Sequence, residues 1–113
     1  MITTLLLTTT LALTPQQAHL EHLETQNAKV QLEFCEEFSN LAKAIHKAHY
    51  SGVVSNARIL EIAEGHSWIA KAVALDVIKS PKATNPKTIA WQRETLGDEI
   101  FATCIDEKFW ERM

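Results

Sequence analysis

Apolar side chains recur along the first half of the chain at intervals of three, four or seven residues, the spacing of a helix with one buried face. The series comprises Leu20, Leu23, Val30, Phe34, Phe38, Leu41, Ile45 and Ala48. Before this series, Thr14 and Gln17 form a capping box and Pro15 suits the first helical position. After the series, Gly52 supplies a C-terminal cap. The pattern predicts a core helix at 30–50. Residues 15–29 precede it as a solvated extension or a separate set of turns.

Two short helices are predicted next. Ser55 is a suitable N-cap for a helix at 56–64 that Gly65 would end. Its inner residues are Ile59, Ile62 and Ala63. The following helix is expected at 67–79, because Ser80 and Pro81 disfavour its continuation. Its inner residues are Ile69, Ala72, Val73 and Val77.

A last helix is predicted at 87–110, where Asn85 caps and Pro86 opens it. Its inner residues are Ile89, Leu96, Ile100 and Cys104. Gly97 lies beside this face and would allow another helix to approach closely. With few Gly and Pro residues and no sustained alternating pattern, the chain of 113 residues is predicted to be all-α: a small bundle of about four helices. It would form a single helical domain at 14–113, with its core at about 30–110.

The chain contains two cysteines, Cys35 and Cys104, which belong to no C-x-x-C pair. This spacing excludes a thioredoxin-like motif and a four-cysteine zinc site. We predict a disulfide between them, joining the core helix to the last helix. Closing a loop of about seventy residues would stabilise the fold by roughly 4 kcal/mol in the chain-entropy model. The alternative is two buried free thiols in a cytosolic protein.

Residues 1–13 resemble a signal peptide, because positions 2–13 form an uncharged apolar run too short to span a bilayer as a helix. A cleavage point is expected after Ala12. Five Thr residues in this run and the lack of Lys or Arg before Lys29 count against it. The alternative is a disordered or β-prone arm on a cytoplasmic protein. We predict a periplasmic or secreted protein with no membrane span after signal removal.

The net charge of −3, with basic residues scattered among acidic ones, is not typical of a protein that neutralises several phosphates. Nucleic-acid binding is therefore not predicted. The loop that carries Lys79, Lys82 and Lys87 lacks acidic residues and could meet an anionic partner, although we prefer its interpretation as a solvated linker.

A family resemblance rests on a frame of small and apolar residues around the two cysteines. The frame comprises Cys35, Leu41-Ala42, Ile45, Ala48, Gly52-Val53, Ile62-Ala63, Ala70, Val73, Asp76, Pro81, Ile100 and Cys104. Over residues 33–106 the chain resembles short exported helical proteins with one cysteine pair, of unassigned function, found in tailed-phage, prophage and proteobacterial genomes. The resemblance implies export and a helical fold. The chain departs from the group in two places. It lacks the charged N-terminal region of the signal peptide, and it carries His66-Ser67-Trp68 where a more acidic turn is usual.

Two H-x-x-H pairs are candidate metal ligands: His19 with His22, and His46 with His49. Residues three apart share a helix face, so each pair could chelate Zn²⁺. A catalytic zinc site would also need a third protein ligand and an activating Glu, which neither pair has. The alternative is solvent-facing histidines with no cofactor.

No catalytic constellation is found, so an enzyme is not predicted. No Gly-x-Ser-x-Gly elbow or Gly-rich loop frames a nucleophile. The adjacent carboxylates at 36–37, 98–99 and 106–107 would point about 100° apart on a helix, which is unsuitable for an acid/base pair.

Three tryptophans, Trp68, Trp91 and Trp110, are candidate interface residues, because tryptophan outside a core often anchors a partner. Partial burial in a small domain is the alternative. We therefore predict a small exported helical binding protein with a protein partner, for example a phage-type inhibitor or regulator of an envelope protein. The alternatives are a periplasmic metal-binding protein that uses the H-x-x-H pairs and a cytosolic helical interaction module.

Overall fold

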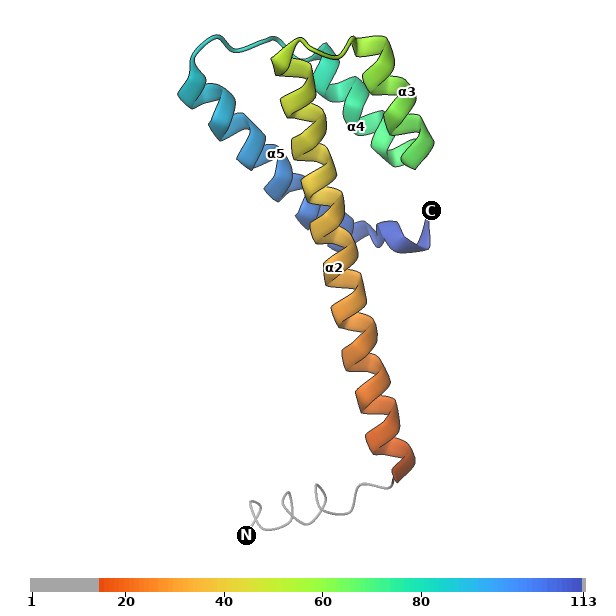
Figure 1. Ribbon diagram of the computed structural model, residues 1–113. Coiled ribbons are helices and arrows are strands. Elements are labelled where there is room, and N and C mark those ends of the chain that lie inside the picture. The colour runs from red at the N-terminus through yellow and green to blue at the C-terminus, as the bar shows by residue number, and fades with distance from the viewer. Residues whose placement is uncertain (1–14, 113) are drawn as a thin grey trace. The chain divides into compact units, whose positions relative to one another are not determined.

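The computed structural model describes the backbone of residues 15–112 and the side chains of residues 27–112. Its elements are α2 (Pro15–Ser51), α3 (Asn56–His66), α4 (Trp68–Lys79), α5 (Pro86–Glu107) and the 3₁₀ turn η1 (Phe109–Glu111) (Figure 1). No strand occurs in residues 15–112. The predicted all-α bundle of about four helices is therefore confirmed. The signal-like segment 1–13 lies outside the described residues.

The chain divides into two units, and the second begins at Leu32. In the first unit, the described side chains at positions 27–30 are exposed. Val30 is 62% exposed, so its predicted place on the inner face of the core helix was wrong. The buried face of α2 begins with Phe34 and Cys35, where apolar residues from the later helices contact it.

Local capping explains where the helices begin and end. The side chains of Ser55, Ser67 and Asn85 each accept a hydrogen bond from a backbone N–H in the first turn of the helix that follows. Gly52 has a φ of 70° and ends α2 as predicted. α3 continues two residues beyond the prediction to His66, because the N–H of Ser67 still donates to the Ala63 carbonyl.

The end of α5 also differs from the prediction. The helix stops at Glu107 rather than near Trp110, because Lys108 adopts a left-handed conformation with a φ of 52°. The chain turns there, and η1 brings Phe109 into the core, where its ring lies edge-on to that of Phe38 at 5.4 Å. A left-handed lysine has no local sequence signal comparable to that of glycine.

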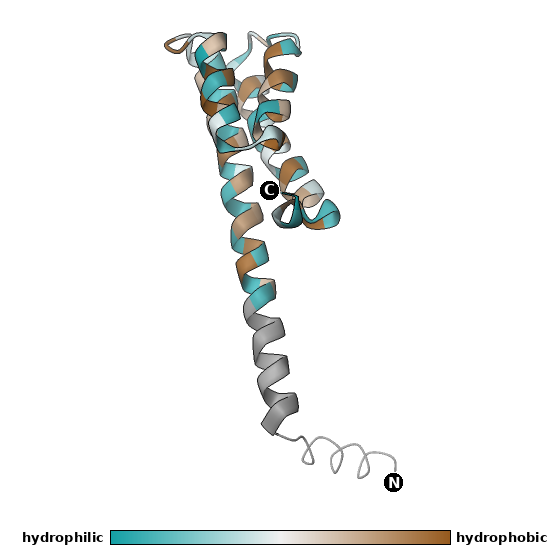
Figure 2. Cartoon of the chain, turned by 90° about the vertical axis from the view of Figure 1, so that its right-hand side faces the viewer, coloured by the Kyte–Doolittle hydropathy of each residue, from teal (hydrophilic) through white to brown (hydrophobic). Residues whose placement is uncertain are grey.

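Side chains from all four helices and η1 form the core of the second unit. Hydrophobic and hydrophilic residues alternate along each of these helices (Figure 2). The buried members are Cys35, Phe38, Ala42, Ile45, Ile59, Ala63, Ile69, Ala70, Val73, Ala74, Val77, Cys104 and Phe109. Two predicted inner residues of α3 and α4 are exposed: Ala72 on α4, and Ile62 on α3, which is 45% exposed. Other predicted inner residues are partly buried against this core: Phe34, Leu41, Ala48, Leu96 and Ile100. α3 buries fewer residues than predicted, only Ile59 and Ala63. The buried face of α4 is rotated from the predicted one and includes Ala70 and Ala74 instead of Ala72.

Helices α2 and α5 are joined in antiparallel register by four contacts, which we call the α2–α5 seam. The seam comprises Cys35–Cys104, Ser39–Gly97, Lys43–Glu94 and His46–Arg93. Both cysteines are fully buried and form the predicted disulfide, with their Cα atoms 5.6 Å apart. The bond therefore links the two longest helices.

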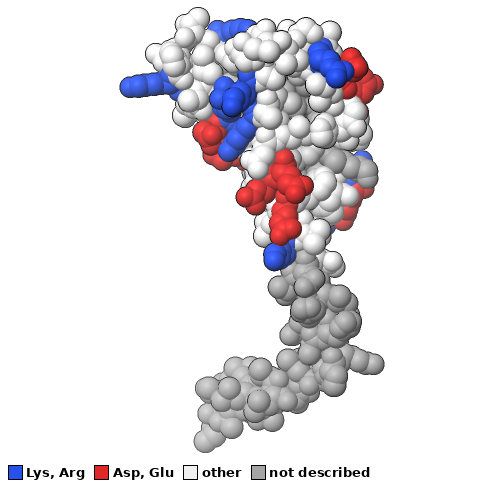
Figure 3. Space-filling model, viewed as in Figure 1, with Lys and Arg blue, Asp and Glu red and all other residues white. Residues whose placement is uncertain are grey.

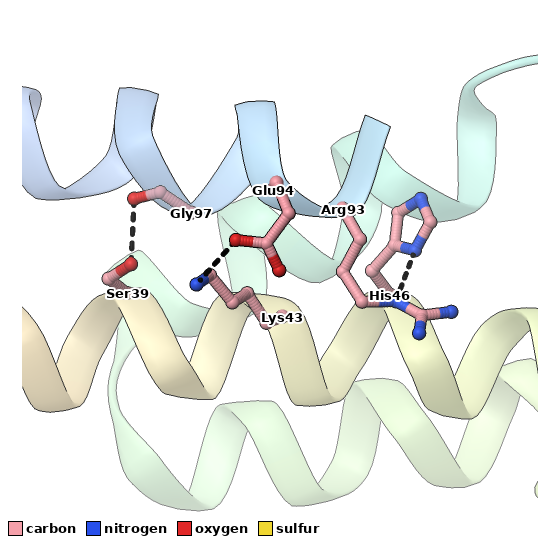
Figure 4. A network of polar contacts seen from close by, with 6 residues as sticks. All are labelled: Ser39, Lys43, His46, Arg93, Glu94 and Gly97. Carbon is pink, nitrogen blue, oxygen red and sulfur yellow. Dashed lines mark hydrogen bonds and ion pairs between the residues drawn. The ribbon is translucent and has the colours of Figure 1, made fainter. Parts of the chain in front are cut away.

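The backbones of α2 and α5 approach each other closely at Gly97. The Ser39 hydroxyl donates a 2.7 Å hydrogen bond to the Gly97 carbonyl (Figure 4). A Cβ atom at position 97 would collide with the Lys43 side chain and lie 3.0 Å from the Ser39 hydroxyl. The predicted role of Gly97 in close helix approach is confirmed.

We expect Gly97→Val to lower the free energy of unfolding by about 1–3 kcal/mol, because the added atoms overlap the Lys43 side chain and crowd the Ser39 hydroxyl, so that Lys43 must leave its place beside Glu94 or α5 must move away from α2. Urea unfolding of the oxidised protein would measure this change. Gly65→Ala is the matched control, since nothing lies within 4 Å of a Cβ added there. The control should leave stability unchanged or raise it by up to about 1 kcal/mol. Equal unfolding midpoints for the two variants would contradict this account of Gly97.

Candidate functional site

An open pocket of about 470 Å³ lies between α2, α4 and α5 in the second unit. Each helix lines it with residues four apart, which share a helix face. The polar and aromatic lining comprises His46 and Tyr50 from α2, Asp76 from α4 and Ser80 directly after it, and Trp91, Gln92, Thr95 and Glu99 from α5. The apolar lining comprises Val77, Leu96 and Ile100. We call this hollow the Trp91 pocket.

His46 lies on the inner wall of the Trp91 pocket and is only 5% exposed. Its Nδ1 accepts a 3.2 Å hydrogen bond from Nε of Arg93 on α5 (Figure 4). An imidazole nitrogen that accepts carries no proton, so this geometry assigns the neutral ring with its proton on Nε2. No described residue pairs with Nε2, and no buried side-chain nitrogen or oxygen in the described part lacks a partner. Nε2 is therefore not sealed in the core, and it opens toward the pocket that His46 lines.

The surroundings of His46 disfavour its protonation. Burial lowers the pKa of His46 below its usual value of 6.5, and the charges of Arg93 and His49 lower the pKa further. The ring is therefore a neutral hydrogen-bond donor toward the pocket at neutral pH.

Tyr50 connects the pocket wall to the loop before α5. Its ring stacks on His46 with centroids 4.6 Å apart, and His49 meets the ring edge-on at 5.6 Å. The Tyr50 hydroxyl accepts a 2.9 Å hydrogen bond from the Ala83 N–H and donates a 3.3 Å bond to Gln92. Tyr50 was not predicted as a site residue, yet its contacts hold one side of the pocket in place. Its position four residues after His46 was the only available signal.

The two described histidines of the H-x-x-H motif have different partners. His46 bonds to Arg93, whereas Nδ1 of His49 lies 2.9 Å from Oδ1 of Asn56. Both are buried, so the alternative of solvent-facing histidines was wrong for this pair. Within residues 27–112 no group of three or more His, Cys, Asp or Glu side chains is placed to hold a metal ion. The side chains of His19 and His22 lie outside the described residues.

The three tryptophans occupy different environments. Trp91 is 66% exposed and forms part of the pocket. Trp68 is 61% exposed, and its Nε1 donates a 3.3 Å bond to the Arg112 carbonyl near the end of the chain. Trp110 is partly buried and packs against the core. Of the three, Trp91 alone borders the large pocket.

Two smaller hollows lie on other sides of α2. One of about 140 Å³ is apolar and runs between α2 and α3, where it includes the exposed Ile62. The other, of about 250 Å³, is lined by Phe34, Phe38 and His66. Leu41 contributes to both. The larger of the two also contains Glu37 of α2 and Ser67, so it has fewer polar side chains than the Trp91 pocket, and the apolar one has none.

Charges are mixed over the described surface. On the face shown in Figure 3, basic side chains lie close to acidic ones, and no continuous basic area extends across it. Four ion pairs occur among the described residues, including Lys43–Glu94 on the seam. No helix in the described part of the chain is long and apolar enough to cross a membrane. The disulfide indicates an oxidising setting outside the cytosol.

No family model, curated protein sequence or solved structure matches the chain.

The buried His46 makes stability depend on pH. The pKa of His46 is lower in the folded protein than in the unfolded chain. At a pH between the folded pKa and 6.5, His46 is therefore protonated to a greater extent in the unfolded chain. The free energy of unfolding should therefore be highest above pH 6.5 and fall as the pH falls through the folded pKa. Urea midpoints measured from about pH 8 to about pH 5 would show this. His46→Gln keeps a polar side chain that does not titrate, so the stability of this variant should fall less steeply as the pH is lowered. Equal pH dependence of stability in the variant and the wild type would refute the role of His46.

Proposed function

We propose that this chain is a small binding protein of the periplasm or the extracellular space, and that it recognises its ligand in the Trp91 pocket. The observation that carries the proposal is the exposed indole of Trp91 beside an open pocket of about 470 Å³. Ligand sites are typically concave and mainly apolar, with a few polar groups that converge on the ligand. His46, Asp76 and Glu99 are such groups, and they come from three helices.

Binding rather than catalysis is favoured by the state of the reactive side chains. Both cysteines are consumed by the disulfide. The hydroxyl of Ser80, which lines the pocket, donates to the Asp76 carbonyl at 2.7 Å and not to His46. The basic nitrogen of His46 is occupied by Arg93. The pocket thus offers recognition groups without an activated nucleophile beside its imidazole.

Two features support export. The signal-like residues 1–13 would direct the chain out of the cytosol, and the Cys35–Cys104 disulfide suits an oxidising compartment. A cytosolic interaction module would leave the disulfide without an explanation. In the phage or prophage setting implied by the family resemblance, the ligand would be an envelope component, and binding would inhibit or regulate it. A protein partner in the envelope stays a prediction.

Export is tested by the intact mass of the protein recovered from a periplasmic or culture fraction. We expect a chain shortened at about Ala12 and lighter by the two hydrogen atoms lost in disulfide formation. The Cys35→Ser/Cys104→Ser double variant provides the reference mass without a disulfide. Recovery of the wild type as a full-length, reduced chain would contradict the proposed compartment.

Ligand recognition is tested with the oxidised chain immobilised on a support. An envelope extract of the producing cell is passed over it, and the components that it captures are identified. Trp91→Ala should weaken retention of the captured component at least tenfold, about 1.4 kcal/mol, because it removes the exposed indole at the pocket. Trp68→Ala is the matched control, since it removes an equally exposed indole remote from the pocket lining. If Trp91→Ala captures the same components as the wild type, the pocket is not the recognition site.

A further inference from the structure

The hydrogen-bonding groups of the Trp91 pocket are arranged with a donor inside and acceptors around it. His46 Nε2–H is a fixed donor, because the Arg93 bond to Nδ1 sets the tautomer and the Tyr50 ring stacks on the imidazole. Asp76 and Glu99 bring carboxylate oxygens from α4 and α5. Neither carboxylate forms an ion pair with a residue that the structure describes. A ligand that matches this lining must both accept and donate hydrogen bonds.

The charges around the pocket disfavour a strongly charged ligand of either sign. The carboxylates of Asp76 and Glu99 repel phosphates and other anions. Nε of Arg93 lies 3.2 Å from Nδ1 of His46, and the Lys82 ammonium lies 5.7 Å from the centre of the Tyr50 ring. These groups oppose the entry of a cation at the inner wall. An uncharged ligand suffers neither repulsion.

The apolar part of the lining requires apolar surface on the same ligand. Trp91 presents its indole to solvent and pocket, and Val77, Leu96 and Ile100 form an aliphatic wall. A sugar ring has an apolar face of C–H groups that packs on an indole, and each of its hydroxyls both donates and accepts hydrogen bonds. A pocket of about 470 Å³ lies in the size range of small-molecule sites.

We propose that the Trp91 pocket binds an uncharged sugar that carries an acetamido group. The acetamido carbonyl accepts a hydrogen bond from His46 Nε2–H, and its amide N–H donates to the Asp76 or Glu99 carboxylate. Its methyl group packs against the aliphatic wall, while the sugar ring stacks on Trp91. The inference rests on the proposed binding function of the same pocket and names its ligand class.

The test is a titration of the full, oxidised chain with N-acetylglucosamine and with its β-1,4-linked dimer. Tryptophan fluorescence and the indole N–H signals in NMR spectra report binding, and the spectrum of Trp91→Ala assigns the Trp91 signal. We expect a saturable shift of that signal with a Kd of about 1 mM or tighter for the better of the two sugars. Glucose, which lacks the acetamido group, should bind at least tenfold more weakly.

Two variants and one further probe serve as controls. Trp91→Ala should abolish the sugar response, whereas Trp68→Ala should retain it, and both variants should keep the helical circular dichroism of the wild type. Free arginine is the probe for a cationic ligand. Arginine binding in the pocket more tightly than either acetamido sugar would overturn the inference, and so would equal binding of glucose.

The failure of the sugar proposal can be told apart from the failure of the binding function. If neither acetamido sugar shifts the Trp91 signal, the inference is wrong. When Trp91→Ala nevertheless loses the captured envelope component, the pocket remains a binding site for another ligand. When the sugars give no response and Trp91→Ala captures as the wild type does, both proposals fall.

Discussion

The antiparallel contact of α2 with α5 is the constraint on which the second unit depends. The disulfide fixes one end of the seam, and Gly97 lets the two backbones approach closely enough for Ser39 to reach its carbonyl. The register of the two helices is therefore set mainly by a covalent bond and a steric fit, and the weaker polar pairs add to it. Lys43–Glu94 is largely solvent-exposed and contributes little by itself. His46–Arg93 is more consequential, because it is partly buried and orients a ring that lines the pocket.

The register of α2 against α5 also positions the residues that line the Trp91 pocket. α5 contributes Trp91, Gln92, Thr95 and Glu99 from the turns that flank Arg93, while α4 closes the opposite side with Asp76 and Val77. Its walls are helices held by a disulfide and a shared core, so little ordering is needed when a ligand binds. The Tyr50 hydroxyl extends the same rigidity to the loop at Ala83. Recognition groups on fixed helices suit a small protein that binds through one preformed site.

Local signals in the sequence were sufficient for the helices but not for the site. Capping at Ser55, Asn85 and Gly52, the cysteine pair and the close approach at Gly97 follow from residue type and spacing alone. Which side chains of a helix are buried depends on the helices that pack against it, and this is why Val30, Ile62 and Ala72 were wrongly predicted to face the core. The hydrogen-bond partner of His46 is Arg93, 47 positions later in the chain, and the sequence gives no local sign of such a pairing. Trp91 was identified as a surface anchor, yet its neighbours in the pocket come from two other helices.

The bond between Arg93 and His46 has an electrical consequence. A guanidinium usually pairs with a carboxylate, which cancels most of its field. Here the acceptor is a neutral imidazole, so the positive charge is not cancelled but polarises the ring. The imidazole transmits that polarity from Nδ1 to Nε2, and the Nε2–H becomes a stronger donor than it would be in an isolated histidine. Arg93 thereby exerts its charge on whatever occupies the pocket without lining it.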